Sequence, residues 1–327
     1  MSPMRPEITR LVCECGQQGI PTFPEARLSD YTTFCLGGPC RCLCQCRYPD
    51  QVEDLVRYLN LQKLDFIVIG GGSNLLVSDD GFDGVVIRYW TDVPQIEGQA
   101  AALKVTASTR LDEVVAYAAA QGWAGMNFLS GIYGTVGGAI AGNAGAFGRQ
   151  ISDCLSSVVL MDRAGQSRIM NLEALKFGYR DSLLKSNGAI ALEAVFALTI
   201  GDKEELLKER QEILSLREQK HPDLRKNPSA GSFFKNVVGP DPGQERQAVG
   251  WFLEQAGAKQ MRCNGAGVFE KHANMIIKQG DCSAQDVFTL AGTLADKVKK
   301  KFDIDLIREV RLVGYFKGDA PSLPWIR

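Results

Sequence analysis

The sequence predicts an α+β fold built from three consecutive segments. Its 327 residues correspond to two domains, or to three small ones that share interfaces, at roughly 150 residues per domain. With 45% hydrophobic and 23% charged residues, the composition is that of a globular protein with a sizeable core. Strand-like and helix-like stretches alternate without a detectable repeat, which favours an α+β arrangement.

The expected elements follow one another along the chain. In the first segment we expect a strand at 40–48, a helix capped by Asp50, and strands at 66–69 and 85–88. In the second we expect a strand at 103–107, a helix at 111–119 stopped by Gly122, and strands at 157–161 and 189–199. A charged helix at 203–220 is the predicted interdomain connector. In the third we expect a helix at 251–255, a strand at 274–278, a helix at 284–301 and a strand at 306–313.

Charge and histidine content exclude several classes of function. Thirty-seven basic and 38 acidic residues leave a net charge of -1, so the electrostatic footprint of a general nucleic-acid or anionic-membrane binder is missing. No run of about 18 apolar residues occurs and residues 1–16 have no signal-peptide core, which predicts a cytoplasmic protein. Only His221 and His272 are present, which argues against a multi-histidine zinc site.

Four cysteines alternate with other residues in the first expected strand: Cys40, Cys42, Cys44 and Cys46. Residues two apart share one face of a strand, so these side chains should form a single stripe. No CxxC pair occurs. We interpret the four as small buried residues, with metal or redox chemistry as the alternative.

Two glycine-rich stretches, 70–74 and 127–148, carry the strongest functional signal. Glycine lets the backbone take positive φ and approach a ligand closely, so that successive N–H groups can point at phosphate oxygens. Neither stretch fits GxGxxG with Rossmann spacing or GxxxxGK[ST], which disfavours an ordinary dinucleotide fold and a P-loop NTPase. Tight turns are the alternative, but two such loops suggest one long diphosphate ligand held by backbone amides.

These stretches resemble the UDP-N-acetylenolpyruvoylglucosamine reductase (MurB) family of flavoenzymes. Residues 68–77 look like its first FAD loop, and 131–138 with 143–148 look like its second. Tyr179-Arg180-Asp181-Ser182 is similar to the YRxS element, 231–236 to the serine loop, and 308–311 to the terminal EVR strand. Order and spacing agree over about 32–314. Tyr133 departs from the proline usual at that position, and the short spacing from Arg180 to Ser232 resembles the short-loop, type II-like subfamily.

The resemblance implies an architecture. A two-part FAD-binding region of the vanillyl-alcohol-oxidase/PCMH type would precede a smaller α+β substrate-binding domain. The first FAD-binding subdomain, with an N-terminal extension, would span 1–95 and the second 96–205. The substrate-binding domain would span 206–327, with its C-terminal strand returning to the active site.

The resemblance also implies a reaction, the NADPH-dependent reduction of UDP-N-acetylglucosamine enolpyruvate to UDP-N-acetylmuramate by non-covalent FAD, in peptidoglycan precursor synthesis. Arg180 suits the substrate carboxylate, because its planar fork matches two oxygens and stays charged. Ser232 is the implied proton donor. Glu309 would join Arg180 in polarising the enolpyruvyl group, with its ionisation controlled by burial.

The remaining implied sites are binding residues, and no metal or nucleic acid is implied. FAD would be bound by Gly70, Gly71, Gly72, Ser73, Asn74, Leu75, Gly131, Gly134, Thr135, Gly137, Gly138, Asn143, Gly145 and Ala146. The substrate would be bound by Tyr179, Arg180, Lys220, Asn236 and His272. Two alternatives stay open: a flavin oxidase of the same superfamily, and a non-catalytic relative that binds a UDP-sugar or flavin.

Overall fold

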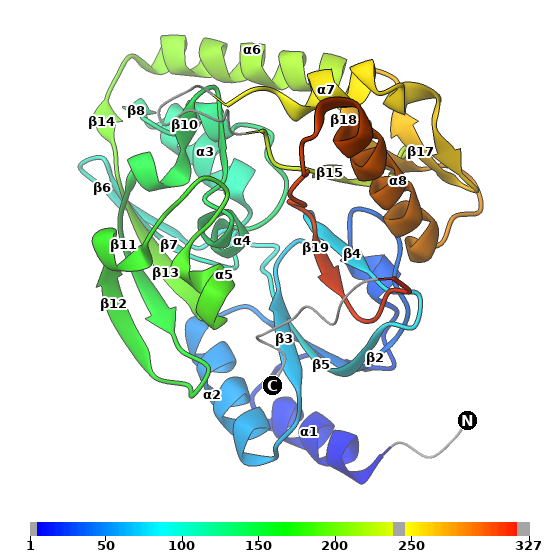
Figure 1. The fold of residues 1–327 in the computed structure, drawn as a ribbon. Helices are drawn as coiled ribbons and strands as arrows, with labels where there is room; N and C mark the ends of the chain where they lie inside the picture. The colour runs from blue at the N-terminus through cyan, green and yellow to red at the C-terminus, as the bar shows by residue number, and fades with distance from the viewer. Residues whose placement is uncertain (1–4, 238–245, 319–327) are drawn as a thin grey trace.

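The first sheet lies in the N-terminal part of the chain. The computed structural model describes residues 5–237 and 246–318, and Figure 1 shows its fold. The sheet has the strand order β1 (Thr22–Pro24), β2 (Cys40–Cys46), β5 (Phe82–Tyr89), β3 (Phe66–Ile69). Strand β5 pairs in parallel with both β2 and β3. The helices of this part are α1 (Pro6–Gln17) and α2 (Pro49–Leu61). Since β3 ends at Ile69, the first glycine loop begins at its carboxyl end.

The second sheet is antiparallel and follows in the chain. Its order is β12 (Ser167–Asn171), β11 (Leu155–Met161), β13 (Ile190–Ala197), β7 (Ala102–Thr106), β6 (Ile96–Gln99). Its helices are α3 (Leu111–Ala120), α4 (Val136–Ala141) and α5 (Leu183–Asn187). Short pairs join β8 (Trp123–Ala124) to β14 (Thr199–Ile200) and β9 (Gly145–Ala146) to β10 (Arg149–Gln150). The second glycine-rich stretch therefore contains α4 and its flanking turns.

The third sheet belongs to the last part of the chain. Its order is β15 (Ser229–Ser232), β18 (His272–Lys278), β17 (Ala266–Phe269), β16 (Arg262–Cys263). Helices α7 (Val249–Gln255) and α8 (Ala284–Phe302) pack against it. The chain then returns to the first part, because β19 (Arg311–Val313) pairs in parallel with β4 (Leu75–Val77), directly after the first glycine loop. Figure 1 shows this red strand beside the cyan β4.

Helix α6 (Lys203–Lys220) connects the second sheet to the third along one edge of the molecule, as predicted (Figure 1). It begins at the expected residue because the Asp202 side chain accepts a hydrogen bond from the Glu205 amide. It is more than a solvated connector, since Arg210 forms a two-fold ion pair with Asp112 of α3 at 2.7 Å. The expected domain boundary at 205/206 falls inside this helix.

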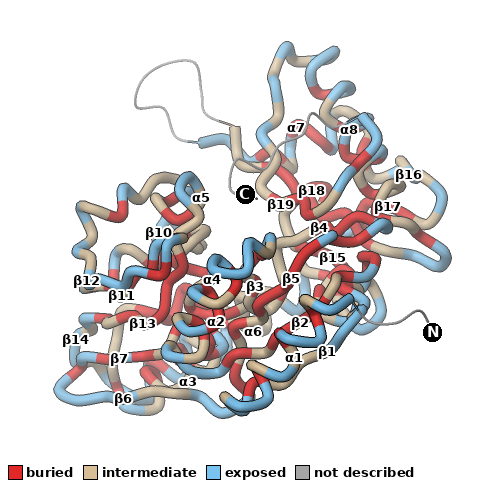
Figure 2. Tube along the Cα trace, turned by 90° about the horizontal axis from the view of Figure 1, so that it is seen from below, coloured by how far each residue is buried: buried red, intermediate tan, exposed pale blue. Residues whose placement is uncertain are grey.

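Buried residues form two large apolar cores. One joins the first two sheets with α2 and α3, and the other fills the third part together with residues of β4 and β19. Figure 2 shows the buried strands inside and the exposed faces of the helices outside. Because apolar burial is the main stabilising contribution, the first two sheets form one body that faces the third sheet.

Three local predictions are wrong. Helix α2 begins at Pro49 with Tyr48 as its N-cap, so Asp50 lies in the first turn; a proline fits that first position because it lacks an N–H. The strand expected at 306–313 covers only Arg311–Val313. Before this strand, Ile307 O accepts a hydrogen bond from the Lys235 amide, and the Glu309 amide donates to Phe233 O. The strand expected at 189–199 ends at Ala197.

The cysteine stripe is confirmed at three of its four positions. Cys42, Cys44 and Cys46 are fully buried in the largest core, where Cys44 Sγ lies 3.9 Å from Cys15 Sγ of α1. Cys40 is also buried but packs in a separate core together with Leu43. Between Cys40 and Cys42 the β2–β5 pairing also shifts register, because β5 advances three residues, from Phe82 to Val85, where β2 advances two.

Candidate active site

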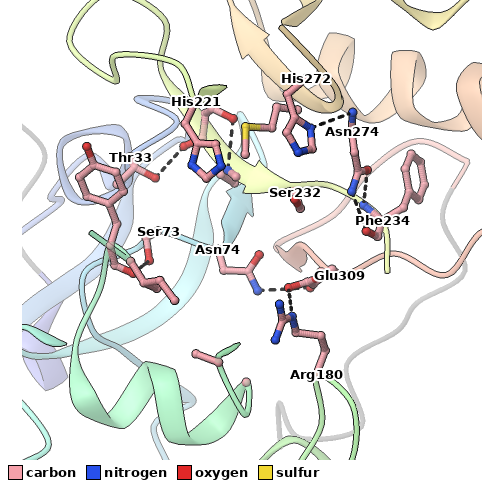
Figure 3. A pocket seen from close by; sticks show the side chains of 18 of the residues that line it. Thr33, Ser73, Asn74, Arg180, His221, Ser232, Phe234, His272, Asn274 and Glu309 are labelled. Carbon is pink, nitrogen blue, oxygen red and sulfur yellow. Dashed lines mark hydrogen bonds and ion pairs between the residues drawn. The ribbon is translucent and has the colours of Figure 1, made fainter. Parts of the chain in front are cut away.

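A cavity of about 480 Å³ lies where the three parts meet. Both glycine loops line it, together with β15, β18, the end of α6 and Glu309. Figure 3 shows Ser232 between His272 and Asn274 on one side and Arg180 and Glu309 on the other. The segments carrying Arg180, Ser232 and Glu309 are far apart in sequence, so only the tertiary fold brings these three side chains to one space.

Backbone bonds around Phe233 bring Ser232 and Glu309 together. Gly231 precedes the serine with φ of 77°, a conformation that favours glycine. The Phe233 amide then donates to Asn274 O at 2.8 Å, and Phe233 O accepts from the Glu309 amide at 2.8 Å. The Asn274 side chain fixes the next residue by exchanging two hydrogen bonds with the backbone of Phe234. Ser232 is thus held between β18 and the C-terminal segment.

Arg180 is held by its own backbone and by three neighbours. Its φ is 53°, which is uncommon outside glycine. Its guanidinium donates to Gly145 O at 2.5 Å, and its Nε lies 3.3 Å from a carboxylate oxygen of Glu309. Its own carbonyl accepts from Lys185 Nζ at 2.6 Å. With a planar fork fixed this way, the side chain can present two donors to a ligand carboxylate.

Burial raises the pKa of Glu309, and the positive charges of Arg180, Lys185 and Lys235 oppose that rise. The ionisation of this carboxyl group is therefore set by the balance between burial and these neighbouring cations. Its backbone is also fixed, because Asn74 Nδ2 donates to Glu309 O at 3.3 Å. This last bond ties the C-terminal segment to the first glycine loop.

A second cavity, of about 200 Å³, runs behind the first. It shares Ser73, Asn74, Gly138 and Gly142 with the larger cavity, so the two adjoin. Both glycine loops form its walls and lie against each other, because Ser73 Oγ donates to Tyr133 O at 2.9 Å. A Cβ on Gly70 would stand 2.3 Å from Thr135 Oγ1, so this close approach requires glycine.

The donor chemistry of the second cavity fits FAD. Backbone amides of two glycine loops and three cationic side chains, Arg163, Lys185 and Arg311, line it. Burial lowers the pKa of Lys185 to about 8 and that of Arg311 to about 10. Lys185 and Arg311, together with the backbone amides, suit a diphosphate, because they can supply donors to the same anionic oxygens.

Most of the predicted cofactor residues line one or both cavities. These are Gly70, Gly71, Ser73, Asn74, Leu75, Gly131, Gly134, Thr135, Gly137, Gly138 and Gly145. Gly72, Asn143 and Ala146 do not line either. Gly72 has φ of 63°, and a Cβ there would meet Tyr31 O at 2.1 Å, so its surroundings require glycine for structural reasons. The buried Asn143 side chain donates to Gln150 and to Gly178 O.

Among the predicted substrate residues, Tyr179, Arg180, Asn236 and His272 line the large cavity. The Tyr179 hydroxyl accepts from the Asn236 amide at 3.4 Å, so these two act as one wall. Lys220 is exposed at the end of α6 and does not line the cavity. The His221 and His272 rings pack edge to face 5.9 Å apart.

Sequence reasoning missed Arg217. This residue of α6 lines the large cavity, and its Nε and Nη2 atoms are buried with no hydrogen-bond partner among the described residues. Burial lowers its pKa. Two buried N–H groups without a partner are costly unless a ligand supplies acceptors for them. No local signal marks it, because it lies in a helix rich in charged residues.

Over 5–237 and 246–318, no group of His, Cys, Asp and Glu could hold a metal ion. In the same part of the chain, no helix is long and apolar enough to cross a membrane.

Comparison with protein families first defines the class of protein. Residues 40–170 match a family described as FAD binding domain. Together with the paired glycine loops and the cationic cavity, this match makes the chain a flavoprotein that binds FAD.

Residues 222–313 match the C-terminal domain of UDP-N-acetylenolpyruvoylglucosamine reductase. The reductase of Lactobacillus helveticus is 35% identical over 298 residues, 91% of this chain and 97% of the relative. UDP-N-acetylenolpyruvoylglucosamine reductase 1 of Bacillus cereus is 36% identical over 288 residues, 88% of this chain and 93% of the relative.

A solved structure of UDP-N-acetylenolpyruvylglucosamine reductase (MurB) from Thermus caldophilus superposes with a TM-score of 0.73 at 30% identity. The superposition covers 90% of this chain and 99% of that one. The chain belongs to the UDP-N-acetylenolpyruvoylglucosamine reductase family. The predicted family and fold class are therefore confirmed.

Proposed function

We propose that this protein reduces UDP-N-acetylglucosamine enolpyruvate to UDP-N-acetylmuramate, with NADPH as electron donor, as a step in peptidoglycan precursor synthesis. Family membership supports the activity. The observation that carries the proposal is the convergence of Arg180, Ser232 and Glu309 on one cavity that adjoins the FAD cavity. Neither an oxidase nor a binding protein requires these three groups at the same place.

The reaction adds a hydride and a proton across the enolpyruvyl double bond. Bound between the two glycine loops, FAD would supply the hydride that originates from NADPH and that the terminal alkene carbon requires. Electron density then moves toward the substrate carboxylate, and the neighbouring carbon needs a proton. The residues of the chain therefore have two tasks, which are stabilising negative charge and supplying that proton.

Arg180 and Glu309 would carry out the first task. The guanidinium stays positively charged throughout and can bind both carboxylate oxygens as negative charge accumulates there. Its anchoring to Gly145 O means that little reorganisation is needed during the reaction. Glu309 lies 3.3 Å from the Arg180 Nε atom and can hold the guanidinium in place beside the substrate carboxylate.

Ser232 is placed for the second task. It lies in the middle of the cavity wall, opposite the Arg180–Glu309 pair, so the substrate double bond can lie between them (Figure 3). Its hydroxyl can donate a proton to the carbanionic carbon on one face, which sets the stereocentre of the product. A serine is a weak acid in water, so its placement beside the developing charge must supply the driving force.

The remainder of the large cavity can hold the UDP-sugar. Tyr179 and Asn236 form one wall, and His272 and Arg217 also line the cavity as polar groups. A diphosphate would supply acceptors for the Nε and Nη2 atoms of Arg217, which have no hydrogen-bond partner among the described residues. Lys220, exposed near this end, can add a point charge without direct contact.

The proposal has two further parts. The divisions 1–95, 96–205 and 206–327 would serve as two FAD-binding subdomains and a substrate domain, since each contains one of the three larger sheets. We expect the reaction to take place in the cytoplasm, because NADPH and UDP-sugars are cytoplasmic metabolites.

Anaerobic spectroscopy tests the function. The purified protein should show a flavin absorbance band that NADPH bleaches and that UDP-N-acetylglucosamine enolpyruvate restores in the absence of oxygen. An oxidase would instead recover rapidly with oxygen alone and would not respond to the enolpyruvyl substrate. A non-catalytic relative would not be bleached by NADPH. Either of these last two results contradicts the proposal.

A further inference from the structure

The FAD cavity extends beyond the glycine loops and beyond Lys185 and Arg311, the two cations that suit a diphosphate. It adjoins the substrate cavity at Ser73 and Asn74, and it extends back along β3 to Phe66. At about 3.3 Å per strand residue, Phe66 lies roughly 13 Å from Gly70 at the start of the glycine loop. Because the reacting ring must face the substrate cavity, the opposite part of the cofactor, its adenosine, must extend toward Phe66.

Arg163 lies at the Phe66 end of this cavity. Its guanidinium carbon is 5.2 Å from the centroid of the Phe66 ring, and the side chain lines the cavity. The apolar residues Leu184, Ala189 and Ile190 line the same cavity. A planar cation held on an aromatic ring between apolar walls matches the chemistry of a purine ring.

The loop that carries Arg163 is fixed in place before any ligand binds. It is the tight turn between β11 and β12, in which the Asp162 amide donates to Gln166 O at 3.0 Å. Helix α2 anchors the turn at two points, since Asn60 Nδ2 donates to Arg163 O at 2.7 Å and Arg57 Nε donates to Gly165 O at 3.3 Å. A group positioned this way loses little conformational freedom when the ligand binds.

We propose that Arg163 stacks on the adenine ring of the cofactor and makes the cavity selective for FAD over FMN. FMN lacks the adenosine and cannot reach this residue. The proposal rests on the assignment of the cavity behind β3 to FAD. It adds a residue outside both glycine loops to the cofactor site.

The test is the affinity of the full-length protein, freed of flavin, for FAD and for FMN, measured by quenching of flavin fluorescence. Arg163→Ala should weaken FAD binding by on the order of tenfold, the size of a partly desolvated cation–π contact, and should leave FMN binding unchanged. Arg163→Lys should recover FAD binding only in part, because an ammonium keeps the charge but lacks the planar surface that stacks on a purine ring. Arg168→Ala, an exposed arginine of the neighbouring β12 that does not line the cavity, is the matched control.

Three outcomes would overturn the proposal. These are unchanged FAD affinity in Arg163→Ala, equal losses for FAD and FMN, or full recovery in Arg163→Lys, which would indicate a phosphate contact instead. Ala189→Phe, which fills the same cavity, tests the assignment on which the proposal rests. If both Arg163→Ala and Ala189→Phe bind FAD as the wild type does, the cavity is not the FAD site. If Ala189→Phe binds FAD weakly and Arg163→Ala binds it normally, the cavity is the FAD site but Arg163 does not contribute to FAD binding.

Discussion

Replacing Arg180 by lysine should separate the two halves of the catalytic cycle. The lysine keeps the positive charge but loses the fork that bonds Gly145 O while reaching toward Glu309. The Arg180 and Glu309 side chains are only 23% and 18% exposed, so water screens their interactions poorly. Removing one contact aimed at developing charge in such a site costs on the order of 10²–10³ in rate, about 2.7–4 kcal/mol.

Stopped-flow absorbance measures each half-reaction separately. In Arg180→Lys, the reduction by NADPH should stay within a few-fold of the wild type, whereas reoxidation by the enolpyruvyl substrate should fall by the factor above. Arg41→Lys is the matched control, because Arg41 also forms a two-fold pair, with Asp83, but lines neither cavity. Equal losses in both halves would refute the reasoning and indicate that Arg180 acts in flavin binding or folding.

Three further predictions concern the cofactor, pH and the first glycine loop. Acid precipitation should release FAD into the supernatant; colour kept in the pellet would show a covalent link. Burial lowers the pKa of His221 to about 4 from 6.5, so the folded protein should lose stability as pH falls from 6.5 toward 4. The drop in melting temperature between pH 7.5 and pH 4.5 should be smaller in His221→Gln than in the wild type, and equal drops would contradict this prediction. Gly72→Ala should lower the free energy of unfolding, measured by chemical denaturation, by more than about 1 kcal/mol, because its Cβ would meet Tyr31 O. The loss should be smaller in Gly148→Ala, where φ is also positive but no atom lies near the added Cβ.

Local patterns in the sequence predicted most of the longer helices and strands and both glycine loops. Helix α6 was predicted with its observed ends, because a run of charged helix formers covers 203–220. The glycine loops could be found because glycine is required wherever two backbones approach closely. Residues 306–310 were misassigned to a strand, since an apolar and charged alternation cannot reveal that their partners are residues 233–235.

The polar groups of the cavities depend on tertiary contacts. Arg217 lies in the charged helix α6, and Lys185 lies in the short helix α5. In both helices the sequence pattern predicts that these side chains are solvated. Only the packing of α6 on α3, and of α5 beside the FAD cavity, buries them. Arg163 is likewise placed by the contacts of its turn with α2, which no spacing along the chain encodes.

Proton delivery by Ser232 is the central claim about this site. Hydride addition leaves a carbanionic carbon that a group on the cavity wall must protonate, and Ser232→Ala removes the proposed donor while barely changing the volume of the wall. Stopped-flow absorbance should show normal reduction by NADPH and reoxidation by the enolpyruvyl substrate slowed by about 10²–10⁴-fold, with partial activity in Ser232→Cys because a thiol can also donate. If reduced Ser232→Ala is reoxidised by that substrate at the wild-type rate, Ser232 is not the acid and the proposed mechanism is wrong.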